Sequence, residues 1–305
     1  TLCTANLKDE LRDHERVQQK KTRLFSATPV HTNMLYRKYC MDWMSKYKKM
    51  RFEQNFSAVG ADVFGEDWTT LRQILEYPCL EQQGAPVKNH FIIGDFSRFD
   101  ISHSRWKLSL AMDVIAAGCE DPDQVHKLGL KLSNYMVAQQ GSVVRVPRGL
   151  PSGCQMTTIL NCILNILLWL TAWRKLTGLN LENFRKHCRL IVYGDDVVFG
   201  MSTNSSFRNI VTPQSIQTIF ANLGYTLESA DSKPLRWVSL DEVVFLKRKF
   251  VPDPFDDRIT HAPRELCEVW TQLHWQRDEL DTEQYKTVFL SAALEFGQHG
   301  PKVFN

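Results

Sequence analysis

The pattern of apolar and polar positions predicts a tight hairpin at residues 190–199. Residues 190–192 and 197–199 are apolar, and the tetrapeptide Tyr-Gly-Asp-Asp separates them. Short apolar runs on either side of a Gly-Asp pair are typical of two strands joined by a turn. The turn therefore carries two adjacent carboxylates, Asp195 and Asp196, which repel each other unless a positive charge lies between them. Because Gly-Asp is also an ordinary turn dipeptide, the tetrapeptide alone does not separate catalysis from simple chain reversal.

The rest of the pattern predicts strands and helices that alternate along the chain. A buried strand is expected at 90–96, where it ends close to Asp95. Helix 213–223 is marked by Pro213 in its first turn and by Gly224 after its last turn. The other predicted elements are a strand at 243–251 and helices at 31–55, 104–117, 157–173 and 264–296. Strands separated by single helices, with a central hairpin, favour an α+β fold built on an antiparallel sheet.

The long apolar run at 157–173 predicts a helix inside the core. The run has 17 residues and is interrupted by Asn161, Asn165 and Thr171. A helix that spans a bilayer needs about 20 predominantly apolar residues. We therefore expect a buried helix here and no transmembrane segment in this chain.

Composition bounds the class of protein. With 305 residues, 43% of them hydrophobic and 23% charged, the chain has material for a globular core and for one large or two ordinary domains. The eight cysteines include no Cys-x-x-Cys pair, so neither a zinc site nor a redox motif is indicated. A reducing compartment fits this usage best.

Charge is distributed unevenly along the chain. Residues 1–55 hold twelve Lys and Arg against six Asp and Glu, a net charge of +6, so the remainder carries −3 of the total of +3. A basic segment beside a core that bears carboxylates suits an anionic substrate bound through metal ions. A solvated surface can show the same bias.

An aspartate outside the hairpin, Asp95, completes a candidate metal site. Asp95 ends the predicted strand, and Asp100 follows five residues later. With Asp195 and Asp196, Asp95 would complete a carboxylate cluster able to hold two hard divalent cations, Mg²⁺ or Mn²⁺. Two-metal sites activate an attacking oxygen and stabilise a leaving one in phosphoryl transfer. The alternative for Asp95 alone is a helix cap or a turn.

A glycine- and proline-rich loop at 141–153 leads into helix 157–173 through several hydrogen-bonding residues. Ser152 lies in the loop, and Thr157 and Asn161 are four residues apart, so these two share one helix face. That face could recognise a sugar hydroxyl. The alternative is that Ser152 caps the helix while the others satisfy hydrogen bonds in the core.

Two basic segments are candidate phosphate-binding sites. Guanidinium groups bind phosphates through two parallel hydrogen bonds, although a charge run is also typical of a solvated surface. The stretch near the N-terminus comprises Lys8, Arg12, Arg16, Lys20, Lys21 and Arg23. The second segment, Lys247, Arg248 and Lys249, lies inside an apolar strand. Since neighbouring residues of a strand face opposite sides, at least one of these cations must point away from the apolar face.

The ordered set of motifs resembles the RNA-dependent RNA polymerases of picorna-like positive-strand RNA viruses, and most of all the dicistrovirus-like and iflavirus-like enzymes. Residues 8–23 resemble the basic fingers motif F, and 95–100 (DFSRFD) resemble palm motif A. Residues 149–161 (GLPSGCQMTTILN) are similar to motif B, and 193–196 (YGDD) to motif C. Residues 245–248 (FLKR) are similar to motif E. The resemblance runs from about residue 5 to 275 in the order of the family.

The resemblance implies a role for each matching residue. Asp95 and Asp195 would be the principal ligands of two Mg²⁺ or Mn²⁺ ions, with Asp196 assisting. The residues that would recognise the ribose are Asp100, Ser152, Thr157 and Asn161. The residues that would hold the triphosphate are Arg12, Arg16 and Arg23, with Lys8 and Lys21 nearby. Those that would support the primer end are Lys247 and Arg248.

Lys233 is the candidate for the motif D lysine, which in the family is thought to protonate the leaving pyrophosphate. It lies in the sequence Ala-Asp-Ser-Lys, after the helix at 213–223. The picornaviral motif has its lysine directly after the aspartate. The extra serine here displaces Lys233 by one position from that pattern.

The resemblance also implies a right-hand polymerase organisation. Residues 1–89 would be a partial fingers region, 90–251 the palm with a fingers insertion near 118–150, and 252–305 a short part of the thumb. The fingers region that precedes the basic motif in the family does not occur in this sequence. We therefore expect the chain to be part of a longer polymerase.

The function implied is template-directed RNA synthesis, with nucleotides transferred from triphosphates to an RNA 3′-hydroxyl. Expected partners are an RNA template and primer, nucleoside triphosphates, a genome-linked protein primer and other replication proteins of the same polyprotein, at membrane-associated complexes in the host cytoplasm. One alternative is a reverse transcriptase, which shares the palm but normally has an aromatic gate where this chain offers Asp100 and Asn161. The other is a non-catalytic RNA-binding fragment, and the intact Asp95, Asp195 and Asp196 argue against it.

Overall fold

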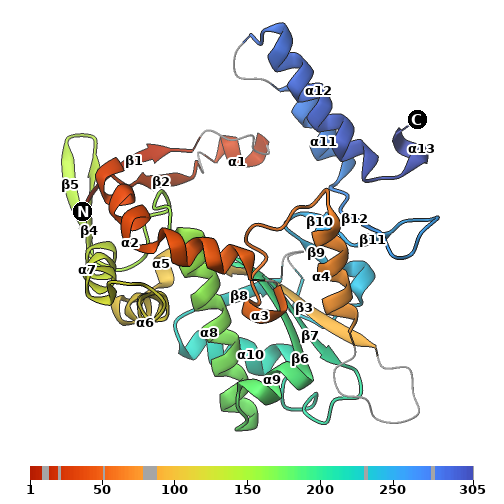
Figure 1. Ribbon diagram of the computed structural model, residues 1–305, viewed down its shortest axis with the longest axis horizontal. Helices are drawn as coiled ribbons and strands as arrows, with labels where there is room; N and C mark the ends of the chain where they lie inside the picture. The colour runs from red at the N-terminus through yellow and green to blue at the C-terminus, as the bar shows by residue number, and fades with distance from the viewer. Residues whose placement is uncertain are drawn as a thin grey trace.

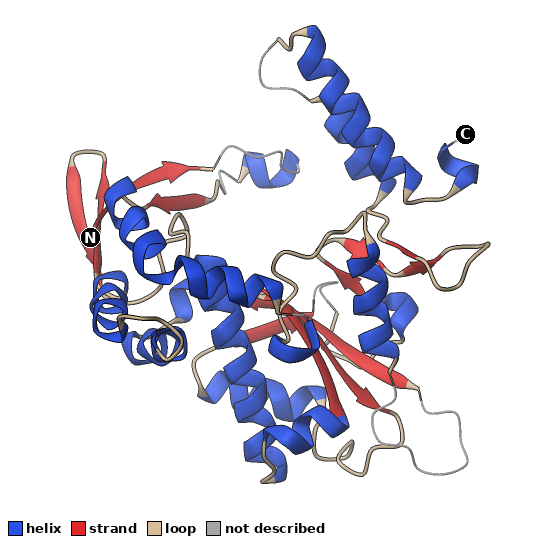
Figure 2. Ribbon diagram, in the orientation of Figure 1, coloured by secondary structure: helices blue, strands red, loops and turns tan. Residues whose placement is uncertain are grey.

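In its described residues, the computed structural model contains two four-stranded sheets, two short two-stranded sheets and the helices packed around them (Figures 1 and 2). It describes residues 1–8, 14–19, 22–50, 52–77, 88–229, 233–275 and 279–304. Strands and helices alternate along the chain as the sequence pattern predicts. The predicted α+β class is therefore confirmed.

The central sheet is antiparallel throughout and has the strand order β6–β7–β3–β8. Its strands are β3 (Asn89–Ser97), β6 (Cys188–Tyr193), β7 (Asp196–Ser202) and β8 (Thr226–Ser229). Strands β6 and β7 form the predicted hairpin, and β3 is the predicted strand that carries Asp95. Strand β3 lies between β7 and β8, so the two aspartate-bearing segments are neighbours in the sheet.

Both faces of the central sheet are covered by apolar residues. In β3, Ile92 and Phe96 belong to the larger cluster, which also contains residues of helices α6 (Arg105–Ala116), α8 (Thr157–Thr177) and α10 (Pro213–Asn222). Phe91 belongs to a smaller cluster on the opposite face, with residues of α4 (Glu66–Glu76). This alternation with a period of two is what a strand buried on both sides requires.

Helix α8 is the predicted core helix and is longer than expected, because it continues to Thr177. Of the described residues, only this helix is long and apolar enough to cross a membrane by length and composition. Its most apolar window is 61% buried by the rest of the protein. This burial agrees with the prediction of a core helix.

Helix α10 has the predicted signals at both ends. Thr212 accepts a hydrogen bond from the Ser215 N–H, the Ser215 hydroxyl accepts one from the Thr212 N–H, and Pro213 occupies the first turn. Gly224 follows the last turn with a φ of 80°, a conformation that glycine adopts without strain. The helix thereby ends at this point, and the chain continues into β8.

The second four-stranded sheet was not predicted from the sequence. Its order is β2–β1–β4–β5, and β1 pairs with β4 in parallel. The strands are β1 (Leu2–Leu7), β2 (Leu24–Ala27), β4 (Tyr135–Gln139) and β5 (Ser142–Val146). We call it the N-terminal sheet. It joins the start of the chain to a segment within 118–150, the region predicted to be a fingers insertion. The domain boundaries at residues 89 and 251 stay a prediction.

Helices connect the two sheets. The predicted helix at 31–55 is two helices, α2 (Val30–Lys49) and α3 (Phe52–Asn55), and α2 packs against α7 (Pro122–Leu132). The short α1 (His14–Gln18) lies between β1 and β2, and α5 (Phe99–Ser102) directly follows β3. Helix α9 (Leu181–His187) leads from α8 into β6.

The predicted strand at 243–251 is interrupted by a turn. Strands β9 (Val244–Phe245) and β10 (Arg248–Lys249) pair with each other through the two-residue turn Leu246-Lys247, which we call the β9–β10 turn. Both turn residues have positive φ, 52° and 61°. Such values suit the turns that match the twist of a hairpin, but they cost free energy for residues other than glycine.

The C-terminal part of the chain is helical as predicted. It contains α11 (Leu266–His274), α12 (Thr282–Gly297) and α13 (Pro301–Phe304), with α11 packed along α12. The short η1 (Leu240–Glu242) and the pair β11 (Val251–Pro252) and β12 (Thr260–His261) precede these helices. Figure 1 shows α11 and α12 projecting at the top of the molecule, away from the central sheet.

Candidate active site

The turn between β6 and β7 presents the paired aspartates. Tyr193 pairs with Asp196, so Gly194 and Asp195 are the two residues of the loop. Gly194 has a φ of 63°, where a residue with a side chain would be strained. Helix α8 supports the turn from beneath: the Asn165 side-chain amide donates to the carbonyl oxygens of Gly194 (3.0 Å) and Asp195 (3.2 Å). The position of the carboxylates is therefore fixed by hydrogen bonds as well as by the hairpin.

The support of this turn extends further along α8. The indole N–H of Trp169 donates to Asn165 Oδ1 (3.1 Å), which orients the amide so that its NH₂ group faces the turn. The Cys162 sulfur accepts a hydrogen bond from the Gly194 N–H. Sequence reasoning missed these supporting roles. A signal was present, because Thr157, Asn161, Asn165 and Trp169 recur every four residues and so lie along one helix face.

The alternation of side chains between the two faces of β3 determines where Asp95 points. It lies on the same sheet face as Phe91 and Ile93, but beyond the apolar cluster that covers them, so its side chain is exposed. Gly94 pairs with Val197, and continuing this register by one residue brings Asp196 opposite Asp95. On the other side, Asp95 pairs directly with Glu228 of β8. The predicted approach of Asp95 to the hairpin aspartates is present in the structure.

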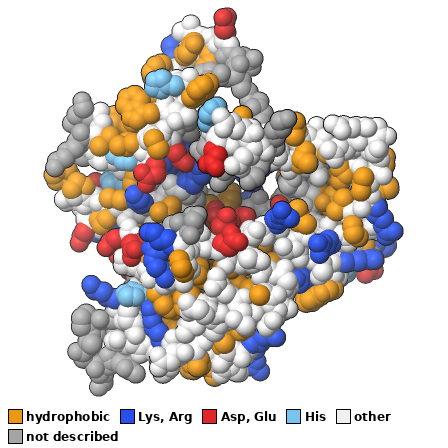
Figure 3. Space-filling model, turned by 180° about the vertical axis from the view of Figure 1, so that it is seen from behind, with side chains coloured by type: hydrophobic (Ala, Val, Ile, Leu, Met, Phe, Trp, Pro, Cys, Tyr) orange, Lys and Arg blue, Asp and Glu red, His pale blue; other side chains and the backbone are white. Residues whose placement is uncertain are grey.

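The proximity of these carboxylates is reflected in their proton affinities. Desolvation by the surrounding protein raises the pKa of Asp196 to about 7, and the charges of Asp195 and Asp95 contribute to the shift. Desolvation also raises the pKa of Asp95, with a further contribution from Asp195, while Arg23 lowers it. Figure 3 shows acidic side chains gathered beside a hollow at the middle of one face of the molecule. We call Asp95, Asp195 and Asp196 the carboxylate cluster.

The carboxylate cluster suits a hard divalent cation in ligand type and charge. Mg²⁺ and Mn²⁺ prefer carboxylate oxygens, and a bound cation relieves the repulsion that adds to desolvation in raising these pKa values. Among the described residues, no three His, Cys, Asp or Glu side chains are gathered tightly enough to surround one ion by themselves. Mg²⁺ sites that bind substrate phosphates commonly use one or two carboxylates together with phosphate and water oxygens.

We expect Asp196→Asn to stabilise the metal-free protein more at pH 8 than at pH 5. The folded-state pKa of about 7 lies above the value of an unfolded aspartate, so the contribution of Asp196 to stability is lost as pH rises through about 7. Removing the charge should raise the free energy of unfolding by about 1–3 kcal/mol at pH 8. Urea unfolding in EDTA at both pH values measures the difference. Asp241→Asn, an exposed change on η1, is the control, and an equal effect of Asp196→Asn at both pH values would contradict this explanation.

Asp100 and Asn161, both predicted to recognise the ribose, form a direct hydrogen bond with each other. The Asn161 amide nitrogen donates to Asp100 Oδ1 at 2.6 Å, although the residues belong to α5 and α8. Arg98 precedes α5 in the left-handed conformation, with a φ of 53°, and this turns the chain back after β3. Burial raises the pKa of Asp100, and the hydrogen bond from Asn161 and the charge of Arg23 oppose that shift.

The loop before α8 is held against two other segments. The Ser152 hydroxyl accepts a hydrogen bond from the Ser26 N–H (3.2 Å), so Ser152 does not cap α8 and instead connects the loop to β2. The Thr157 hydroxyl donates to the Pro151 carbonyl (2.9 Å). A Cβ on Gly153 would lie 2.6 Å from the Ser26 carbonyl oxygen, which explains the requirement for glycine at this contact.

The basic residues near the N-terminus are only partly described. Arg23 lies before β2 and lowers the pKa of both Asp95 and Asp100, so its charge acts on the site. The Lys8 N–H donates to the Arg23 carbonyl (2.8 Å), which places Lys8 beside it. Arg12 and Lys21 lie outside the described residues, and Arg16 is in α1 with a side chain outside the described set.

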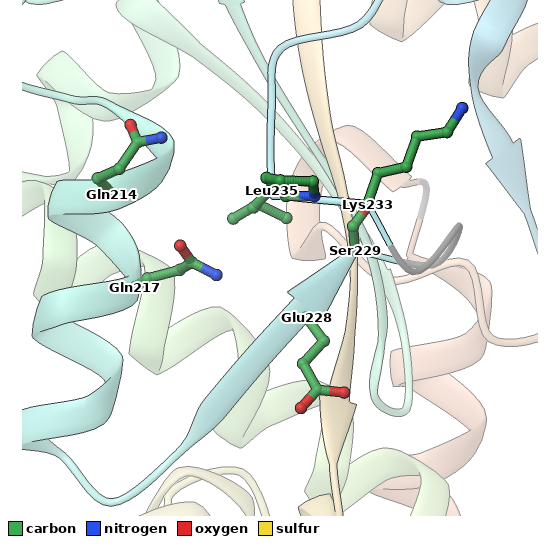
Figure 4. Close-up of a pocket in the computed structure, with 7 residues that line it drawn as sticks. Gln214, Gln217, Glu228, Ser229, Lys233 and Leu235 are labelled. Atoms are coloured by element: carbon green, nitrogen blue, oxygen red, sulfur yellow. The ribbon is translucent and has the colours of Figure 1, made fainter.

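Lys233 lies beside the end of β8. With Glu228 and Gln217 it lines a cavity of about 510 Å³ between α10 and β8 (Figure 4). In Figure 4 the Lys233 side chain extends away from Gln214 and Gln217 of α10. Glu228, on the same strand, pairs with Asp95 of the carboxylate cluster. Lys233 therefore lies near the end of a strand that contacts this cluster.

Lys247 and Arg248, predicted together as primer-binding residues, have different environments. Lys247 is exposed in the β9–β10 turn and forms an ion pair with Glu268 (2.6 Å). Arg248 is buried, with 8% of its surface exposed, and its guanidinium binds both carboxylate oxygens of Glu295 at 2.9 and 2.6 Å. It also donates to the Ala262 carbonyl (2.7 Å). The interpretation of Arg248 as a primer contact is therefore corrected: its cation is used inside the protein, to join β10 to α12.

Comparison with known proteins agrees with this geometry. The chain is 29% identical over 320 residues to the replicase polyprotein of acute bee paralysis virus, covering 98% of the chain and 16% of the polyprotein. It is 28% identical over 323 residues to the genome polyprotein of deformed wing virus, covering all of the chain and 11% of that polyprotein. The chain thus spans a small part of these relatives.

A solved structure has the same fold. The Sicinivirus 3Dpol RNA-dependent RNA polymerase superposes with a TM-score of 0.82 at 24% identity, over 99% of this chain and 60% of that one. The family model described as viral RNA-dependent RNA polymerase matches residues 1–305. The resemblance drawn from the sequence motifs is thereby confirmed over the whole length, and the chain belongs to the viral RNA-dependent RNA polymerase family.

Proposed function

We propose that this chain carries the catalytic centre for template-directed RNA synthesis. The observation that supports this most directly is the neighbouring placement of Asp95 and the Asp195-Asp196 turn, on strands that are adjacent in the central sheet. The charges of Asp195 and Asp95 add to the desolvation that raises the pKa of Asp196, so the three carboxylates repel one another unless cations lie between them. A negatively charged substrate bound through metal ions would relieve this repulsion.

The proposed reaction is nucleotidyl transfer. The 3′-hydroxyl of an RNA primer attacks the α-phosphorus of a bound nucleoside triphosphate, a phosphodiester bond forms, and pyrophosphate leaves. Asp95 and Asp195 would hold two Mg²⁺ or Mn²⁺ ions, with Asp196 assisting. When bound, such ions lower the pKa of an attacking oxygen and neutralise charge on the phosphates. The protein contributes the fixed position of these carboxylates, maintained by Asn165 and the hairpin.

Other residues have roles in substrate recognition in this proposal. The Asp100–Asn161 pair, with Ser152 and Thr157, would recognise the ribose hydroxyls. The charge of Arg23 already acts on the site, so Arg23 would hold the triphosphate, with Lys8 beside it. Arg12, Arg16 and Lys21 are proposed for the same role from the motif alone. Lys233 would protonate the leaving pyrophosphate, and Lys247 would contact the primer.

The proposed partners follow from the same reaction. They are an RNA template and primer, nucleoside triphosphates, and the other replication proteins of the polyprotein from which such a chain is cut. A genome-linked protein is a further proposed primer. The proposed site of action is the membrane-associated replication complexes of the host cytoplasm.

Primer extension in a complete polymerase that contains residues 1–305 tests this function. We expect metal-dependent incorporation of ribonucleotides on an RNA template and strong discrimination against 2′-deoxynucleotides. Preferred incorporation of deoxynucleotides would instead identify a reverse transcriptase. RNA binding in a filter assay without any extension would identify a non-catalytic RNA-binding protein, and either result would overturn the proposal.

A further inference from the structure

A buried histidine lies directly behind the Asp100–Asn161 pair. His103 connects α5 to α6 and is 0% exposed. Its Nε2 lies 2.9 Å from Asn161 Oδ1, and its Nδ1 lies 3.0 Å from the hydroxyl of Tyr225. Both ring nitrogens are therefore in hydrogen bonds inside the protein.

The hydrogen-bond partners fix the direction of every bond in this chain of side chains. Burial lowers the pKa of His103 to about 4, so the ring is neutral and carries one proton. Since the Asn161 NH₂ group donates to the Asp100 carboxylate, Asn161 Oδ1 must accept, and the proton of His103 is on Nε2. Nδ1 then accepts from the Tyr225 hydroxyl. The donors run in one direction, from Tyr225 through His103 and Asn161 to Asp100.

This order excludes the alternative orientation of the Asn161 amide. With the amide reversed, its oxygen would face the Asp100 carboxylate, so two acceptors would oppose each other at 2.6 Å. His103 could meet the reversed NH₂ group only in its other tautomer, with Nε2 accepting and the Nδ1–H turned toward the Tyr225 hydroxyl. Because Asn161 is 6% exposed, water cannot readily compensate for such a reversal. The Asp100 carboxylate therefore selects the amide orientation, and the Nε2–H of His103 holds the Asn161 oxygen so that the NH₂ group stays directed at Asp100.

Tyr225 anchors this arrangement to the segment between α10 and β8. It is 2% exposed and packs against the Phe99 ring, with 5.4 Å between ring centroids. The ammonium group of Lys107 lies 3.9 Å above the Tyr225 ring and donates to the Leu223 carbonyl at the end of α10. Three parts of the chain that are distant in sequence thus meet at His103: α5, α8 and the segment between α10 and β8.

We propose that His103 is a positioning residue that orients Asn161 toward Asp100 and thereby sets the preference of the polymerase for ribonucleotides. This inference rests on the proposed function, because it assigns the 2′-hydroxyl to the Asp100–Asn161 pair. His103 does not touch the nucleotide. It acts through Asn161, and the hydrogen bond from the Tyr225 hydroxyl to Nδ1 keeps the imidazole ring in place.

The test compares NTP with 2′-dNTP in the complete polymerase. Replacing His103 by Phe keeps a planar ring but removes the donor to Asn161, and we expect the ratio of kcat/KM for NTP over dNTP to fall by about tenfold. His103→Gln retains a donor near the position of Nε2 and should keep most of the preference. Tyr225→Phe should give an intermediate loss. His187→Phe, a half-buried histidine stacked on Trp173, is the control and should leave the ratio unchanged.

The outcomes separate the inference from the function on which it rests. A purely structural role would lower kcat or thermal stability for both nucleotides and leave the ratio at its original value, which would overturn the inference. Dissociation constants of GTP and 2′-dGTP, measured with Mg²⁺, give a second comparison that needs no turnover. If the original protein discriminates in binding but extends no primer, the proposed function fails while the His103 variants still test the inference. If neither nucleotide binds, both proposals are overturned.

Discussion

Asp195→Asn should reduce RNA synthesis by roughly a thousandfold or more, to a level that primer extension barely detects. The substitution keeps the size of the side chain and removes one charge from the carboxylate cluster. The Asn165 hydrogen bonds go to backbone carbonyls of Gly194 and Asp195, so the turn itself should keep its conformation. The expected defect is therefore in catalysis and metal binding rather than in folding.

Two measurements make this expectation specific. Thermal unfolding without metal should show an unchanged or higher Tm, because one of three mutually repelling carboxylates is gone. The control Asp241→Asn changes an exposed aspartate on η1 and should extend primers at the original rate. Extension by Asp195→Asn at a rate near that of the original protein would show that Asp195 is not a metal ligand.

Glu295→Gln should lower the free energy of unfolding by about 3 kcal/mol or more. Glu295 is 7% exposed and binds the buried guanidinium of Arg248 through both carboxylate oxygens. The substitution leaves that guanidinium inside the protein without a counter-charge, and this is the costly way to break a buried ion pair. Urea denaturation of the complete protein gives the change directly.

The residue after Arg248, Lys249, forms a second ion pair that serves as a matched control. Lys249 pairs with Glu265 at 2.9 Å, but both side chains are largely exposed, 48% and 64%. Glu265→Gln should therefore cost less than about 1 kcal/mol. Replacing Arg248 and Glu295 together by apolar residues of similar size should restore most of the lost stability, because no unpaired charge remains. Equal costs for Glu295→Gln and Glu265→Gln would refute the assignment of a buried pair.

Periodic segments were the predictable part of the fold. Strand β3 and the β6–β7 hairpin have apolar residues on both faces, and α10 has clear signals at both ends, so each could be located from the sequence alone. Strand β5 could not, because four of its five residues are exposed and no alternation exists to detect. Its partner β4 and the distant β1 are held by backbone pairing, which leaves little trace in side-chain pattern.

The candidate site was also only partly predictable from the sequence. Asp95, Asp100 and the hairpin aspartates follow from local sequence and motif order, and the structure brings them together. Side-chain contacts that depend on tertiary packing could not be predicted from the sequence. Arg248 is the example: its sequence context indicates a cation facing away from an apolar strand, whereas its counter-ion is 47 residues later in the chain. No local pattern reports such a distant carboxylate.

The order of strands in the central sheet has a consequence for the newly made chain. Strand β3 forms ladders with β7, made about 100 residues later, and with β8, made about 130 residues later. During synthesis both edges of this apolar strand are therefore open until Ser202 and then Ser229 have emerged from the ribosome. Open apolar edges are where nascent chains associate wrongly. Asp95 thus lies on a strand whose two neighbours are both made much later, and we expect productive folding to depend on shielding β3 during that delay.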